Sequence, residues 1–166
     1  MTVSLATAAL MAGTTHAKDT CRAIVFSGGG NNGAWEVGVL YGMLANGNAA
    51  DFEFDVVTGV SAGSINAGGM AGWAVGQEME AAQWLSDTWN GMSNSDVWVD
   101  WSLGKVSGAL LMGGMLDDAP LLNTLQRLID EFPEGYKRRI TLAAVDVDTG
   151  DFTEFDQTNT VFSDLP

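Results

Sequence analysis

Phe54-Asp-Val-Val-Thr-Gly-Val-Ser-Ala-Gly63 is the stretch that decides the fold. The apolar run at 54–58 is typical of a buried β-strand, and the Ala-, Gly- and Met-rich run at 64–74 is typical of a helix that lies close to a sheet. A Gly-x-Ser-x-Gly turn between a strand and a helix lifts the serine hydroxyl clear of the backbone, and the helix N-terminus points its free N–H groups at it. We therefore predict that Ser61 is a catalytic nucleophile, with a purely structural turn as the alternative.

A second strand, loop and helix precede this turn. The apolar run at 22–27 predicts a strand, Gly28-Gly-Gly-Asn-Asn-Gly33 predicts a loop, and 34–45 predicts a helix. The apolar side chains that recur at helical spacing predict the inward face of that helix. They are Val37, Leu40, Tyr41 and Leu44.

The glycine loop has two interpretations. It satisfies Gly-x-Gly-x-x-Gly, the pattern of a dinucleotide site, but such a site needs an acidic residue at the end of the next strand. Here Glu53 and Asp55 stand at that strand's start, and Ser61 follows its end. A serine hydrolase needs backbone donors beside its nucleophile, so we predict an oxyanion hole. Its donors would be the N–H groups of Gly28, Gly29, Gly30 and Ala62, and the motif glycines Gly33, Gly59 and Gly63 would allow the close packing around them.

The rest of the chain predicts more helices and then a strand pair. Helices are expected at 77–89, with Met79, Ala82, Leu85 and Trp89 on one face, and at 121–130, with Leu122, Leu125 and Ile129 inward and a start at Asp117-Asp118-Ala119-Pro120. The segment 90–114 is expected to be irregular. A strand at 140–147, a turn at 148–150 and an antiparallel strand at 152–155 end the pattern. This order predicts an α/β fold of three layers, with a mostly parallel central sheet flanked by helices.

Charge narrows the partners. The chain has 166 residues, with 7 Lys+Arg against 21 Asp+Glu, so its formal net charge is −14. Nucleic acid is excluded as a partner because phosphate binding needs a basic face, and attraction to anionic membranes by charge is disfavoured.

Three smaller features have simple interpretations. The basic run at 137–139 is expected to be a solvated loop, with a lipid-headgroup site as the alternative. Met112 and Met115 are expected to fill gaps in the core. Cys21 is the single cysteine, so no disulfide forms within the chain.

The N-terminus resembles a signal peptide. Residues 3–12 are apolar, and Thr15-His16-Ala17 offers small residues near a cleavage point. The run is too short to cross a bilayer. Residues 1–17 are therefore interpreted as a signal peptide without a basic n-region, which favours secretion or an endomembrane lumen, with a cytoplasmic location as the alternative.

The general base and the acyl pocket are harder to assign. The single histidine, His16, lies in this leader, so no Ser-His-Asp triad can form in the remainder and a carboxylate is the expected base. Trp98 and Trp101 either line an acyl pocket or a lipid interface, or cover the core beneath a long loop.

The glycine loop, the Gly-x-Ser-x-Gly turn about thirty residues later and the absence of a usable histidine together resemble the patatin-like phospholipases. The stretch 143–155 is also similar to a strand pair of that family. The resemblance implies a patatin-like acyl hydrolase domain over 22–166 that cleaves carboxylic esters of lipids through a Ser–Asp dyad, with no metal and no cofactor. It also implies a lipid or acyl-ester substrate and transient contact with a membrane or lipid interface. Ser61 would be the nucleophile and Gly28, Gly29 and Gly30 the oxyanion loop.

Two departures from the family stand out. Asn32 occupies a position where the family usually has Lys or Arg, and no Asp-Gly occurs, although the family's dyad aspartate lies in Asp-Gly-Gly or Asp-Gly-Ala. Asp146 and Asp148 match the strand pair and not this motif. We therefore expect a domain cut before its dyad aspartate and inactive alone. Two other functions stay open: a nucleotide-binding module that uses Gly28–Gly33, and a non-catalytic lipid-binding relative.

Overall fold

The computed structural model describes residues 20–112 and 114–157, so the predicted signal peptide lies outside the described residues. Four strands form one sheet in the order β1-β2-β3-β4. The strands β1 (Ala23–Phe26), β2 (Val56–Val60) and β3 (Arg139–Val145) are parallel, and β4 (Phe152–Asp156) is antiparallel to β3. The predicted α/β class, the mostly parallel sheet and the final antiparallel pair are confirmed.

Five α-helices and two short 3₁₀-helices are described in this part of the chain. They are α1 (Asn32–Asn46), η1 (Ala49–Phe52), α2 (Ala62–Ala71), α3 (Glu78–Gly91), η2 (Asn94–Asp96), α4 (Gly104–Leu111) and α5 (Ala119–Asp130). The segment 90–114 was expected to be irregular, and that prediction was wrong because it contains η2 and α4. Its glycines and serines concealed the helix, since both residue types are weak helix formers.

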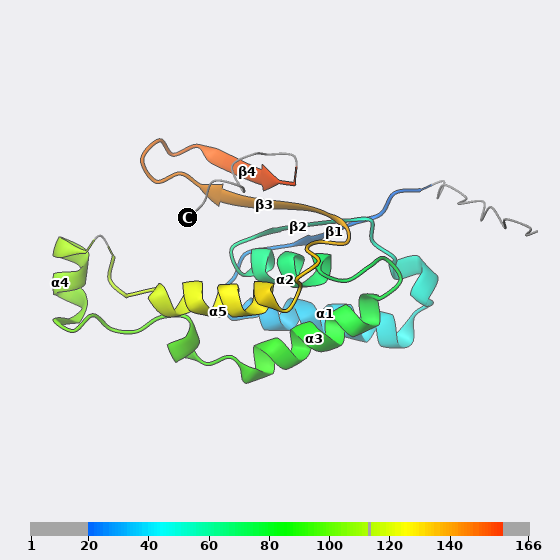
Figure 1. Ribbon diagram of the computed structural model, residues 1–166, viewed down its shortest axis with the longest axis horizontal. Coiled ribbons are helices and arrows are strands. Elements are labelled where there is room, and N and C mark those ends of the chain that lie inside the picture. Colours follow the sequence, from blue (N-terminus) through cyan, green and yellow to red (C-terminus); the bar gives the residue numbers. More distant parts are fainter. Residues whose placement is uncertain (1–19, 113, 158–166) are drawn as a thin grey trace, which may run out of the picture.

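The helices α1, α2, α3 and α5 lie on one face of the sheet (Figure 1). Neighbouring strands follow each other along the chain, and parallel crossovers are right-handed, so successive crossovers place their helices on the same side. The second helical layer of the expected three-layer arrangement is not among the described residues. On the uncovered face Val25 is 72% and Val145 is 61% exposed.

The core lies between the sheet and α2, with α1 and α3 packed behind. The fully buried side chains include Leu40, Val57, Met70 and Leu85. Helix α2 can lie close to the sheet because its residues are small, as its sequence predicts.

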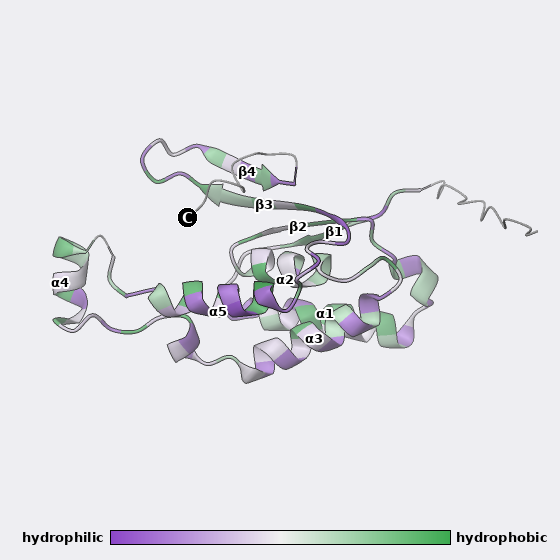
Figure 2. Cartoon of the chain, viewed as in Figure 1, coloured by the Kyte–Doolittle hydropathy of each residue, from purple (hydrophilic) through white to green (hydrophobic). Residues whose placement is uncertain are grey.

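Several predicted side-chain orientations need correction. Tyr41 is 39% and Leu122 is 70% exposed, although each was predicted to face inward. Helix α5 carries alternating hydrophilic and hydrophobic bands (Figure 2), and its rotation turns Leu121 and Leu128 toward the neighbouring helices, together with Leu125, which was predicted correctly. Ile129 shares that side of the helix but remains 54% exposed. Met112 and Met115, expected to fill gaps, are 60% and 62% exposed.

The basic run at 137–139 is not simply a solvated loop. Arg138 is 5% exposed and its Nη1 lies 2.8 Å from Oε1 of the buried Glu78. The same guanidinium donates hydrogen bonds to the carbonyl oxygens of Phe54, Trp73 and Ala74. This ion pair therefore joins the start of β3 to the start of α3, and the prediction of a solvated loop was wrong for Arg138.

Candidate active site

Ser61 occupies a strained turn between β2 and α2. Its φ is 56° and its ψ is −126°, and it is the single non-glycine residue with positive φ among the described residues. Such a conformation costs on the order of 1–3 kcal/mol and persists where the surrounding structure enforces it. The residue lies at the N-cap of α2, so the positive end of the helix dipole and the Ala62 N–H group adjoin it.

The two glycines that flank the turn are required by close backbone packing. A Cβ atom on Gly59 would lie 2.1 Å from the Gly63 carbonyl oxygen, and a Cβ atom on Gly63 would lie 2.4 Å from the Phe26 carbonyl oxygen. Real Cβ atoms do not approach backbone so closely. The turn therefore brings β1, β2 and α2 together at the serine.

The glycine loop lies directly beside this turn. A Cβ atom on Gly28 would lie 3.2 Å from the Cβ of Ser61, and Gly30 has a φ of 56°. The bonds that close the loop use the N–H groups of Asn32 and Gly33, which donate to the carbonyl oxygens of Gly29 and Gly30. The N–H groups of residues 28–30 lie before this first turn of α1 and are not among the donors that close the loop. Gly30 lines the same cavity as Ser61 and Ala62, whereas Gly28 and Gly29 do not line it.

A polar network that the sequence did not reveal holds the loop against the turn. The Asn66 side chain is fully buried, its Nδ2 donates to the Gly33 carbonyl oxygen at 3.0 Å and to Glu36 Oε2 at 3.2 Å, and its Oδ1 accepts from Trp89 Nε1 at 2.8 Å. Glu36 Oε1 in turn accepts from the N–H and the hydroxyl of Ser27. An amide within a run of Ala, Gly and Met was the signal that could have indicated this role.

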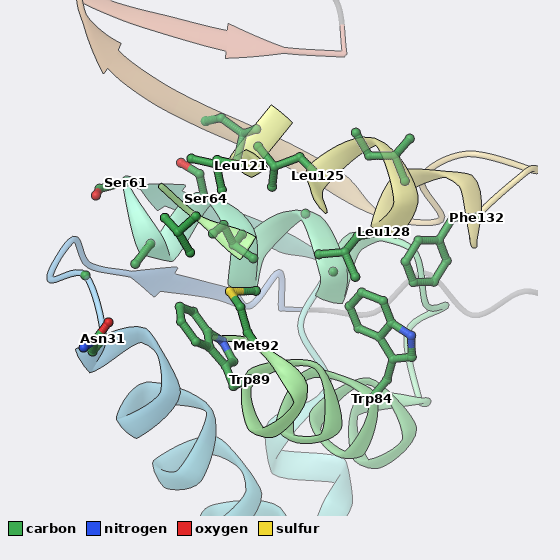
Figure 3. Close-up of a pocket in the computed structure, with 18 of the residues that line it drawn as sticks. Asn31, Ser61, Ser64, Trp84, Trp89, Met92, Leu121, Leu125, Leu128 and Phe132 are labelled. Atoms are coloured by element: carbon green, nitrogen blue, oxygen red, sulfur yellow. The ribbon is translucent and has the colours of Figure 1, made fainter. Parts of the chain in front are cut away.

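An apolar cavity of about 510 Å³ opens beside Ser61. Helices α2, α3 and α5 supply most of its walls, with Trp84, Trp89 and Met92 on one side and Leu121, Leu125 and Leu128 on the other (Figure 3). Tyr136 also lines the cavity, and burial raises the pKa of its phenol, so this group stays neutral near pH 7. The volume and the lining suit an apolar ligand such as a hydrocarbon chain.

The two tryptophans that the sequence grouped have different positions. Trp98 lines the cavity, whereas the Trp101 indole donates to the Gly114 carbonyl oxygen at 2.9 Å and packs against Gly108. The acyl-pocket position therefore fits Trp98, whereas Trp101 packs against α4 and is not among the described residues that contact the core.

The carboxylate of Asp146, near the β3–β4 turn, has a structural role. Oδ1 of Asp146 accepts hydrogen bonds from the N–H groups of Asp148 and Thr149, so this carboxylate closes the turn. Within residues 20–112 and 114–157, no Asp, Glu or His lines the cavity. The same residues include no cluster of three or more His, Cys, Asp or Glu side chains that could hold a metal ion.

Comparison with known proteins gives the family. The model of the family described as patatin-like phospholipase matches residues 24–165. No curated protein and no solved structure gave a significant match. In the described residues no helix is both long enough and apolar enough to span a bilayer. The match covers most of the chain, includes both the glycine loop and the Ser61 turn, and agrees with the α/β fold. The chain belongs to the patatin-like phospholipase family, whose members are lipid acyl hydrolases.

Proposed function

We propose that this protein hydrolyses carboxylic esters of lipids with Ser61 as its nucleophile. The observation that carries the proposal is the position of Ser61. It is held in a strained conformation at the N-terminus of α2, with the Gly28 backbone against it and an apolar cavity beside it. A nucleotide site fits less well, because the cavity lining is apolar and includes no Lys or Arg among the described residues.

The reaction would proceed by acyl transfer. The Ser61 hydroxyl oxygen attacks the ester carbonyl carbon while a base takes its proton, and the carbonyl oxygen becomes an oxyanion. The N–H groups of Gly28, Gly29, Gly30 and Ala62 would donate hydrogen bonds to that oxygen. The C–O bond to the alcohol breaks, the alcohol oxygen takes the proton from the base, and the acyl group stays on Ser61. Water then attacks the acyl carbonyl carbon and gives a proton to the base, the bond between the acyl group and the Ser61 oxygen breaks, and that oxygen takes the proton back from the base as the fatty acid leaves.

The base is proposed to be an aspartate outside the described residues. Among those described, Asp146 closes a turn and no carboxylate lines the cavity, whereas the family uses a Ser–Asp dyad. Asn32 packs against Gly29 at the start of α1, where a family member would usually have a cation. Backbone N–H groups would therefore stabilise the oxyanion without help from a cation. The substrate would reach the site through transient contact of the protein with a lipid interface.

Hydrolysis of p-nitrophenyl butyrate by the full native protein tests the proposal. The Ser61→Ala variant should lose on the order of 10⁴-fold or more in kcat, because removal of a nucleophile leaves only binding and oxyanion contributions. The Ser86→Ala variant is the matched control, since Ser86 lies on α3 away from the cavity lining. Turnover of Ser61→Ala close to that of the control would overturn the proposal.

A further inference from the structure

Two aromatic rings lie at the far end of the cavity. Figure 3 places Ser61 at one end of the cavity and Trp84 and Phe132 at the other. The rings meet edge to face with centroids 5.1 Å apart, and the Trp73 ring also packs edge to face with Phe132, with centroids 6.3 Å apart. The Trp84 Nε1 donates to Glu131 Oε2 at 2.8 Å, which fixes the indole. The end wall is therefore held from several directions.

Glycines of α2 explain where these rings rest. A Cβ atom on Gly69 would lie 2.6 Å from the Trp84 ring, and a Cβ atom on Gly72 would lie 2.4 Å from the Phe132 ring. Both rings thus pack directly on the α2 backbone. A Cβ atom on Gly68, which lines the cavity, would meet nothing within 4 Å. There is therefore open space above Gly68, and the two rings cover the α2 backbone just beyond it.

We propose that this cavity binds the acyl chain of the substrate and that Trp84 and Phe132 set the accepted length at about ten carbons. The inference rests on the proposed function, because the chain is placed by its carbonyl at Ser61. Eight residues of helix separate Ser61 from Gly69, which is about 12 Å at 1.5 Å per residue. An extended chain advances about 1.2 Å per bond, as a polypeptide backbone does, so about ten carbons reach the aromatic end.

The cavity volume identifies length as the limit. A cavity of about 150 Å³ holds benzene, which is about 25 Å³ per carbon, so about 510 Å³ could hold roughly 20 carbons. The cavity is therefore wider than a single acyl chain requires, and the aromatic rings at its far end would limit the length of that chain. The substrates would be esters of medium-chain acids, with the alcohol part left outside the cavity.

Binding of saturated primary alcohols to the Ser61→Ala variant tests this inference, because binding needs no turnover. The fluorescence of Trp84, Trp89 and Trp98 reports occupancy, since all three line the cavity. Affinity should rise about fourfold per methylene up to decanol and then level off. Affinity that climbs steadily to hexadecanol would overturn the inference.

Two variants should move this limit in opposite directions. The Gly68→Leu variant fills the open space above α2 next to the aromatic end and should shorten the preferred chain, because the leucine side chain would stand in the path of the last carbons. The Phe132→Ala variant opens the far end and should lengthen the preferred chain. The Gly38→Leu variant is the control, because Gly38 lies on α1, is exposed and has equal space for a Cβ atom.

Ester hydrolysis and alcohol binding together distinguish a failure of the proposed function from a failure of the proposed length limit. Length-limited binding without ester hydrolysis by the full native protein would overturn only the proposed function. Ester hydrolysis with no plateau in chain length would overturn only the length limit. A Gly68→Leu variant that folds and keeps the original profile would also overturn the length limit, even where Phe132→Ala fails to fold.

Discussion

The buried amide of Asn66 should stabilise the whole site, and the Asn66→Leu change removes it at nearly constant volume. The orientation of the amide follows from its partners: Gly33 O and Glu36 Oε2 only accept, so they face Nδ2, and Trp89 Nε1 only donates, so it faces Oδ1. Leucine would leave all three without this partner.

The expected cost follows from the groups left unsatisfied. The Trp89 N–H is left without its acceptor at about 1–3 kcal/mol, the Gly33 carbonyl within α1 and Glu36 Oε2 each lose one bond, and leucine regains part of this through apolar burial. We expect the free energy of unfolding to fall by about 3 kcal/mol, a large fraction of the roughly 5–15 kcal/mol typical of a domain. Urea unfolding followed by circular dichroism measures it.

A double-variant cycle separates the hydrogen bond from general packing. The Trp89→Phe change removes the N–H donor, so Asn66→Leu should cost about 1–3 kcal/mol less in that background. The Asn90→Leu variant, at an exposed position of α3, should shift the free energy of unfolding by no more than about 0.5 kcal/mol. An Asn66→Leu variant as stable as this control, or two single effects that simply add, would refute the reasoning.

Two further variants test the packing behind the site. The Gly63→Ala variant should be destabilised by about 1–3 kcal/mol in urea unfolding, because its Cβ would lie 2.4 Å from the Phe26 carbonyl oxygen. A variant as stable as the wild type would show that the backbone can shift to accommodate the methyl group. The Arg138→Met variant should lose about 3–5 kcal/mol, because it leaves the buried Glu78 carboxylate unpaired, and adding Glu78→Gln should recover part of that loss. A double variant less stable than Arg138→Met would contradict this explanation.

The sequence predicted those features that depend on local pattern. The strand before Ser61 and the helix after it follow from an apolar run, a glycine-bounded turn and a run of small residues, and the structure has each of them within a few residues. The glycine loop beside Ser61 was also predictable, because parallel strands bring the loops at their carboxyl ends to one edge of the sheet.

Features that depend on long-range contacts were not predictable. The Glu78–Arg138 pair joins residues sixty positions apart, and the basic run around Arg138 has the composition of a surface loop. The rotation of α5 is set by the helices it meets, so periodicity alone predicted Leu125 inward correctly but could not choose between Leu121 and Leu122. Glu36 and Asn66 have roles that appear only when α1 and α2 lie together.

The most direct measurement is the reaction of the full native protein with a fluorophosphonate probe, with the modified residue located by mass spectrometry. The probe forms a covalent bond with an activated serine and displaces fluoride. A single modification at Ser61 is expected, absent in Ser61→Ala and retained in Ser86→Ala. A protein that stays unlabelled, or carries the label at another serine, would contradict the assignment of Ser61 as the nucleophile, and an unlabelled protein that still binds alcohols would instead be a non-catalytic lipid-binding relative.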